Sequence, residues 1–83
     1  MENKILIDVI VPILEENYNV FIPVGKTVKS IEEQLKKSIA DLSLGAINEG
    51  QIMRLYNSDG KLIDSNCYIK DSGIKNGSKV ILV

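Results

Sequence analysis

Apolar and polar residues alternate along several stretches of the chain, as they do in strands that bury one face of a sheet. Residues 4–11 are dense in branched apolar side chains and are predicted to form the first strand, which Pro12 ends. A polar turn at residues 15–17 leads into a second alternating stretch, residues 17–24. These two stretches together predict an antiparallel hairpin at the start of the chain.

A different spacing begins after Thr27, a residue type suited to cap the N-terminus of a helix. The helix is expected to end near Ser43, with Gly45 as its C-terminal breaker. Apolar residues recur every three or four positions and predict one buried stripe, made of Val28, Ile31, Leu35, Ile39 and Leu42. On the opposite, solvated face two acid-before-base pairs are expected, namely Glu32 with Lys36 and Glu33 with Lys37.

Shorter segments complete the predicted sheet. Residues 52–56 are expected to form a third strand, residues 61–63 a short fourth strand, and residues 79–83 the last strand. Gly73 and Gly77 can each adopt a positive φ in the turns before that last strand. The resulting order is β-β-α-β-β-β. It predicts an α+β fold in which a mixed sheet of four to five strands carries one main helix across one face, the β-grasp, as a single domain over residues 1–83.

The element order, the helix start at Thr27 and the segment from Ile69 through Gly77 to Leu82 resemble ubiquitin along nearly the whole chain. A bacterial subgroup is similar in more detail. The run Asp71-Ser-Gly-Ile-Lys-Asn-Gly77 before an apolar last strand, and the helix opening Val28-Lys-Ser-Ile31, resemble the YukD/EsaB proteins. These are small ubiquitin-like accessory components of type VII (WXG100 substrate) secretion systems in Gram-positive bacteria. The apolar segment of residues 12–14 departs from the short members of that group.

The resemblance implies a non-conjugating ubiquitin-like protein that acts by binding, with cytosolic parts of a secretion ATPase or membrane component as its partner. It supplies no catalytic residues. A second class remains open, a ubiquitin-like regulatory module outside secretion that works as a homodimer. A third class, a sulfur carrier or covalent modifier, needs a C-terminal Gly-Gly, whereas this sequence reads Leu82-Val83 at its end.

The inventory of reactive side chains also favours binding over catalysis. The chain has no histidine and one cysteine, so neither a Ser-His-Asp arrangement nor the usual Cys and His zinc sets can be assembled. Cys67 would need a nearby cation to act alone as a nucleophile, and Lys70 is the one basic residue close to it in sequence. We expect Cys67 to pack as a small apolar residue. No enzyme activity, metal or cofactor is predicted.

Charge and hydropathy limit the partners and the compartment. Ten Lys and Arg are interspersed with eleven Asp and Glu, and the net charge of −1 gives no field to hold nucleic acid or an anionic membrane. The longest apolar stretch, residues 5–14, is interrupted by Asp8 and Pro12, which argues against membrane insertion. The first residues lack the layout of a secretory signal, and the single cysteine cannot form an internal disulfide. A cytoplasmic protein is therefore expected.

Strand alternation predicts which side chains lie on the face of the sheet that the helix does not cover. If Ile7 and Val9 face the helix, the opposite face is apolar and is edged by Asp8 and Arg54. The candidate protein-binding residues on this outer face are Leu6, Ile10, Phe21, Arg54, Tyr56, Ile81 and Val83. A solvated sheet face normally carries polar residues, so this set predicts a surface for a partner or for self-association. Two alternatives stay open: one strand shifted by one residue, or scattered exposed apolar groups without a role.

Overall fold

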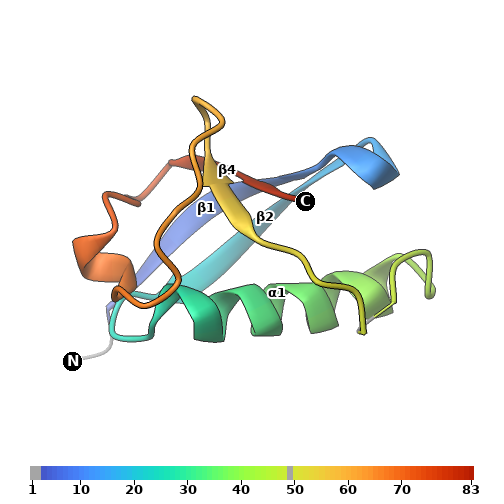
Figure 1. The fold of residues 1–83 in the computed structure, drawn as a ribbon, viewed down its shortest axis with the longest axis horizontal. Helices are drawn as coiled ribbons and strands as arrows, with labels where there is room; N and C mark the ends of the chain where they lie inside the picture. Colours follow the sequence, from blue (N-terminus) through green and yellow to red (C-terminus); the bar gives the residue numbers. More distant parts are fainter. Residues whose placement is uncertain (1–2, 49) are drawn as a thin grey trace.

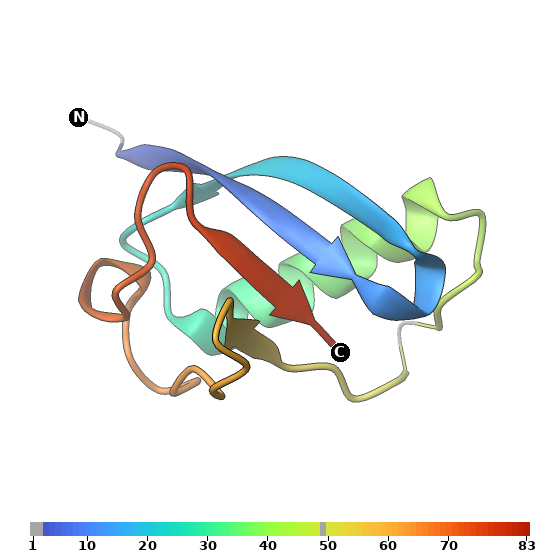
Figure 2. The ribbon, with the colours of Figure 1, turned by 90° about the horizontal axis from the view of Figure 1, so that it is seen from above.

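In the computed structural model, which describes residues 3–48 and 50–83, four strands form one mixed sheet with a single α-helix across one face (Figure 1). The strands are β1 (Lys4–Val11), β2 (Glu16–Pro23), β3 (Leu55–Asn57) and β4 (Lys79–Leu82), and the helix is α1 (Val28–Leu42). Their order across the sheet is β2-β1-β4-β3. Seen from above, the helix runs diagonally behind the strands (Figure 2). The chain therefore has the α+β architecture of the β-grasp.

The N-terminal hairpin forms where the alternating pattern predicted it. Strand β1 has the predicted bounds, and it pairs antiparallel with β2 from Lys4 opposite Pro23 to Val11 opposite Glu16. The connection is a short 3-10 helix over Pro12–Leu14, and Glu15 closes it at a positive φ of 53°. Residues 12–14, the segment in which this chain departs from the short YukD/EsaB proteins, thus form a compact turn. It lengthens the hairpin connection and leaves the strand register intact.

Helix α1 begins at the predicted cap, because the Thr27 Oγ1 accepts a hydrogen bond of 3.2 Å from the Ser30 N–H. The predicted apolar stripe is correct for Val28, Ile31, Leu35 and Ile39, which are all buried. It is wrong for Leu42, which is 65% exposed at the last turn. The buried face of the helix instead includes Glu32 and Lys36, two charged residues that were predicted to lie in solvent.

The expected acid-before-base pairs are also wrong, for the same reason. Glu32 is buried and its Oε2 accepts a 2.9 Å hydrogen bond from the Leu55 N–H, so it is engaged with the backbone of β3. The Lys36 Nζ donates to the Gln51 carbonyl at 2.9 Å and lies 3.1 Å from the Glu33 Oε2, one turn back. Glu32 and Lys36 therefore attach the helix to the segment that enters β3, a tertiary role that local spacing does not reveal.

The third strand is shorter than predicted and the fourth is not formed. Strand β3 covers Leu55–Asn57, and Ile52 is exposed outside it. In place of a strand, residues 61–63 contribute an isolated bridge between Leu62 and Tyr56. The observed order is therefore β-β-α-β-β. The Lys61 carbonyl accepts from the Asn57 N–H at 2.8 Å, which closes a tight hairpin after β3.

Backbone conformations with positive φ fall largely on glycine, as expected for the turns before β4. Gly73 and Gly77 have φ of 87° and 88°, and Gly45 after the helix has φ of 84°. Leu44 is different, because it adopts φ of 56° while its side chain is 96% exposed. A left-handed conformation is strained for a leucine, and no burial of its side chain offsets that strain.

Replacing Leu44 with glycine is therefore expected to raise the free energy of unfolding by up to about 1 kcal/mol. Glycine adopts this φ without the Cβ clash, and little apolar contact is lost. Chemical denaturation measures the change. The matched control is Leu42→Gly, an exposed leucine inside the helix, which should lower stability because glycine disfavours helix. Equal losses from both substitutions would contradict the strain at Leu44.

One cluster of buried side chains fills the space between the sheet and α1. Its strand members include Ile7, Val9, Val11, Val80 and Leu82, and its helix members include Ile31 and Leu35. Ile69 and Ile74, from the irregular segment before β4, close the same cluster. The core thus lies entirely on the helix side of the sheet and leaves the other side to solvent.

Candidate protein-binding surface

The structure places the predicted strand faces in the predicted register. Ile7, Val9, Val80 and Leu82 are at most 1% exposed, and Met53 and Leu55 are buried with them. Tyr18 and Val20 of β2 pack against the same core. A strand shifted by one residue would have exposed its inward side chains, and none of these strands does so. The alternative of a shifted strand is therefore excluded. All seven candidate residues consequently belong to the outer face of the sheet.

The outer face contains a row of apolar side chains that crosses three strands. Ile10 of β1 lies opposite Ile81 of β4, and Ile81 lies opposite Tyr56 of β3. All three are partly exposed. Neighbouring strands of a sheet lie about 4.7–4.9 Å apart, so these side chains form a continuous strip.

Two further apolar side chains extend this strip. Val83 follows β4 and pairs with Arg54 through two backbone hydrogen bonds, of 2.9 Å and 3.1 Å. Leu62, bridged to Tyr56, lies beyond β3 and is 54% exposed. Together these residues form the Tyr56 patch, which consists of Ile10, Tyr56, Leu62, Ile81 and Val83, with the exposed Arg54 at its rim.

Leu6 and Phe21 are not continuous with the Tyr56 patch. They lie opposite each other on β1 and β2, and Phe21 is 64% exposed. Between them and the patch runs a polar row, in which Asp8 is opposite Asn19 on one side and Lys79 on the other. The single apolar face expected from the sequence is therefore divided into two parts.

Leu62 is a member that the sequence reasoning missed. Residues 61–63 were expected as a strand and no face was assigned to them. The information was present in the turn, because Asn57 and Gly60 predict a tight hairpin that brings Leu62 back beside Tyr56. The Asn57 Oδ1 accepts from the backbone N–H groups of Asp59 and Lys61, at 2.9 Å and 3.0 Å, and fixes that turn.

Strand β3 holds Tyr56 in place from behind. The Leu55 N–H, which points to the helix, donates to the Glu32 carboxylate, and the Leu55 carbonyl accepts from the Ile63 N–H at 3.0 Å. Leu55, the residue before Tyr56, is thus held through both of its backbone groups, and its side chain is completely buried. The patch is built on a short strand whose position is fixed by α1.

The remaining chemically interesting residues have structural roles. Cys67 is partly buried against the core, and its Sγ donates to the Asp64 carbonyl at 3.2 Å. The Asp64 Oδ1 accepts from the Asn66 N–H at 2.9 Å, as in a turn.

Within residues 3–48 and 50–83 no group of three or more His, Cys, Asp and Glu side chains is placed to hold a metal ion. No helix in that part of the chain is long and apolar enough to cross a membrane.

No protein-family model and no curated protein matches the sequence. Solved structures do. The EccD5 ubiquitin-like domain from Mycobacterium xenopi superimposes with a TM-score of 0.80 at 11% identity, over 98% of this chain and 93% of that one. The ubiquitin-like domain of the Mycobacterium tuberculosis type VII secretion system protein EccD1 gives 0.74 at 10% identity, over 98% of each chain.

A ubiquitin-like domain of an Arabidopsis thaliana protein is similar with a TM-score of 0.66 at 25% identity, over 98% of this chain and 77% of that one. The similar structures thus come from proteins with different settings, and what they share is the architecture. Together with the sheet order and the helix across one face, they show that the chain has the ubiquitin-like β-grasp fold.

Proposed function

We propose that this protein is a binding module without catalytic activity, a ubiquitin-like accessory component of a type VII secretion system of the YukD/EsaB kind. Its partner would be a protein in the cytoplasm, such as the cytosolic part of a secretion ATPase or membrane component. The observation that carries the binding role is the Tyr56 patch. An apolar strip across three strands, with an arginine at its rim, is the composition of protein interfaces, where aromatic residues and arginine are enriched.

Three similar structures support the secretion setting. The EccD5 and EccD1 domains superimpose with TM-scores of 0.80 and 0.74, and their low identity bears on the fold alone. A chain of an ESX-5 inner membrane complex also contains a region of this fold, with a TM-score of 0.78, of which this chain covers 20%. Of the residues that resemble YukD and EsaB, those from Asp71 to Gly77 lead into β4, and those from Val28 to Ile31 open α1.

A ubiquitin-like regulatory module outside secretion is the second candidate. It is favoured by the Arabidopsis domain, whose 25% identity exceeds that of the EccD domains. Genes for WXG100 proteins and an FtsK-like ATPase beside the gene for this chain would favour the secretion role. Their consistent absence would favour the second candidate.

Replacing Tyr56 with alanine is expected to weaken binding to the partner about 30-fold, because a central aromatic residue of an interface contributes about 2 kcal/mol or more. Stability should fall by less than about 1 kcal/mol, since Tyr56 loses only cross-strand contacts on a solvated face. Affinity is measured by calorimetry against the cytosolic domains of the secretion ATPase.

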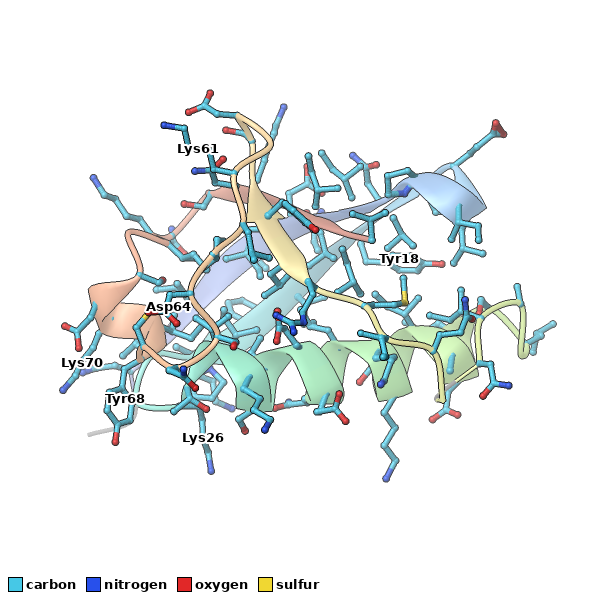
Figure 3. The ribbon with its side chains drawn as sticks, viewed as in Figure 1. Tyr18, Lys26, Lys61, Asp64, Tyr68 and Lys70 are labelled. Carbon is cyan, nitrogen blue, oxygen red and sulfur yellow. The ribbon has the colours of Figure 1, made fainter. Side chains whose placement is uncertain are left out.

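The matched control is Tyr68→Ala. Tyr68 is an exposed tyrosine in the segment before β4, where the Lys70 Nζ lies 5.7 Å from its ring centre, and it is remote from β3 (Figure 3). This substitution should leave the affinity unchanged. A Tyr56→Ala variant that binds as tightly as the native chain would remove the patch from the function, and unfolding of the variant would show that Tyr56 belongs to the core.

A further inference from the structure

Strand β2 is an edge of the sheet, and it is long for an edge. It has eight residues and lies outside β1, away from β4 and β3 (Figure 2). Proteins usually protect an edge strand with a lysine, a bulge, an inward charge or a covering segment, because unpaired backbone groups attract another strand. The sequence of β2, Glu-Asn-Tyr-Asn-Val-Phe-Ile-Pro, has no lysine, and its one proline stands at the end.

The hydrogen bonds of β1 show which backbone groups of β2 are open. The Leu6 carbonyl accepts from the Gly77 N–H, and the Asp8 N–H donates to the Ser78 carbonyl, so these residues of β1 face away from β2. The intervening residues of β1 bond to β2 in an antiparallel ladder. By the register, the backbone groups of Asn17, Asn19 and Phe21 must then point outward. In the described part of the chain no other segment bonds to them.

We propose that β2 pairs antiparallel with β2 of a second copy of this chain, about a two-fold axis at Asn19, to form one continuous eight-stranded sheet. This register uses every open position. Asn19 pairs with Asn19 of the other copy, and Asn17 pairs with Phe21 in both directions. A two-fold axis places a residue opposite itself, and the neutral amide of Asn19 can accept and donate there without the repulsion that a charged residue would meet.

Side chains on the inner face fit the same register. Tyr18 and Val20 are only partly buried, because they lie at the edge of the core. About the Asn19 axis, Tyr18 of one copy is opposite Val20 of the other, an aromatic and β-branched pair that is favourable across strands. Pairing would therefore extend the core across the junction between the two copies.

Charge at the two ends of β2 is complementary under this symmetry. Glu15 and Glu16 lie at its first end, whereas Lys4, the cross-strand partner of Pro23, and Lys26 lie near its last end. Antiparallel pairing brings the acidic end of each copy beside the basic end of the other. Pro23, which has no N–H group, ends the pairing without leaving an open donor. These features favour a second copy as the occupant of the edge.

Asn19→Pro tests the pairing while sparing the protomer. The Asn19 N–H makes no bond to residues 3–48 or 50–83, so proline removes only the bond to the second copy, and edge strands tolerate proline at such a position. The dissociation constant of the dimer, from sedimentation equilibrium of the full chain over a concentration series, should rise at least about tenfold. The circular dichroism spectrum should stay native.

A charge swap provides a test that does not depend on proline. Asn19→Lys and Asn19→Asp should each dissociate the dimer at low salt, since like charges then meet at the axis. An equimolar mixture of the two variants should restore dimers as heterodimers. The control is Asn66→Lys, the same change at an exposed asparagine far from β2 in the sequence, which should leave the dimer intact.

Three results would overturn the inference. They are a native chain that stays monomeric to millimolar concentration, a dimer that Asn19→Pro does not weaken, and a mixture of the two charge variants that stays monomeric. Dissociation by Tyr56→Asp instead of by the Asn19 variants would place self-association at the Tyr56 patch. Tyr56 and Asn19 lie on different strands, so the two tests are independent. If the Asn19 variants do not affect dimerisation, the proposed partner binding through the Tyr56 patch still holds. If Tyr56→Ala does not affect partner binding, the proposed β2 pairing still holds.

Discussion

Replacing Leu55 with alanine is expected to lower the free energy of unfolding by about 2–5 kcal/mol, the range for deleting a fully buried leucine side chain. Leu55 has no exposed surface, and it lies opposite Leu82 of β4 inside the core. The truncation loses apolar contacts and leaves a cavity between the sheet and α1. Urea denaturation followed by circular dichroism measures the change.

The control for this experiment is Leu62→Ala, the same chemical change seven residues further along the hairpin. Leu62 is largely exposed on the outer side, so its loss should lower stability by less than about 1 kcal/mol. Similar losses at the two positions would contradict the assignment of the faces of β3. Leu62→Ala should instead weaken partner binding, if the Tyr56 patch is the binding surface.

Replacing Glu32 with alanine is expected to lower the free energy of unfolding by about 1–3 kcal/mol. Glu32 is 4% exposed, and its carboxylate accepts from the Leu55 N–H. Alanine leaves that N–H buried without a partner, which is the costly outcome for a backbone donor. The same denaturation experiment measures this loss.

Two variants separate the hydrogen bond from other effects of the substitution. Glu32→Gln keeps an oxygen that can accept from Leu55 and should therefore be less destabilising than Glu32→Ala. Glu33→Ala removes a neighbouring carboxylate whose side chain is 66% exposed and whose partner is Lys36. Because the Glu33 carboxylate is largely in solvent and Lys36 keeps its bond to the Gln51 carbonyl, a change below about 1 kcal/mol is expected. A glutamine variant as unstable as the alanine variant would show that the bond to Leu55 does not stabilise the fold.

The sequence predicted the strand faces well because burial dictates them. Ile7, Val9 and Val11 alternate with outward residues over a full strand, and no other register buries all three. The helix start was equally predictable, since Thr27 caps it through its own side chain. Fold class followed from these local features and from the order of the elements.

Prediction failed where a tertiary contact decides the outcome. Glu32 and Lys36 lie four positions apart on the same side of the helix as Val28 and Ile39, yet as charged residues they were assigned to solvent. They are buried because the backbone of residues 51–55 supplies a donor to one and an acceptor to the other. The strand expected at residues 61–63 does not form, because this segment pairs with β3 only through one bridge, between Leu62 and Tyr56.

The seven candidate residues were each assigned correctly to the outer face, but neither Leu62 nor the division of that face was predicted. Alternation assigns a side chain to a face and says nothing about its neighbours on adjacent strands. The polar row of Asn19, Asp8 and Lys79 emerges only once the register across β2, β1 and β4 is known. That register depends on the turns between the strands, whose geometry is not encoded in the apolar pattern.

The parallel pairing of β1 with β4 also determines how this chain must acquire its structure. Ile10 and its partner Ile81 are neighbours in the sheet although nearly the whole sequence separates them, and the Leu6 N–H donates to the Asn76 Oδ1 across 70 positions. Closing so long a loop costs entropy before any contact compensates it, which slows folding relative to a helical bundle. On the ribosome, the hairpin and α1 emerge before β4, and until then the core lacks Val80 and Leu82. The fold is therefore completed only when β4 pairs with β1, in a nearly all-or-none step.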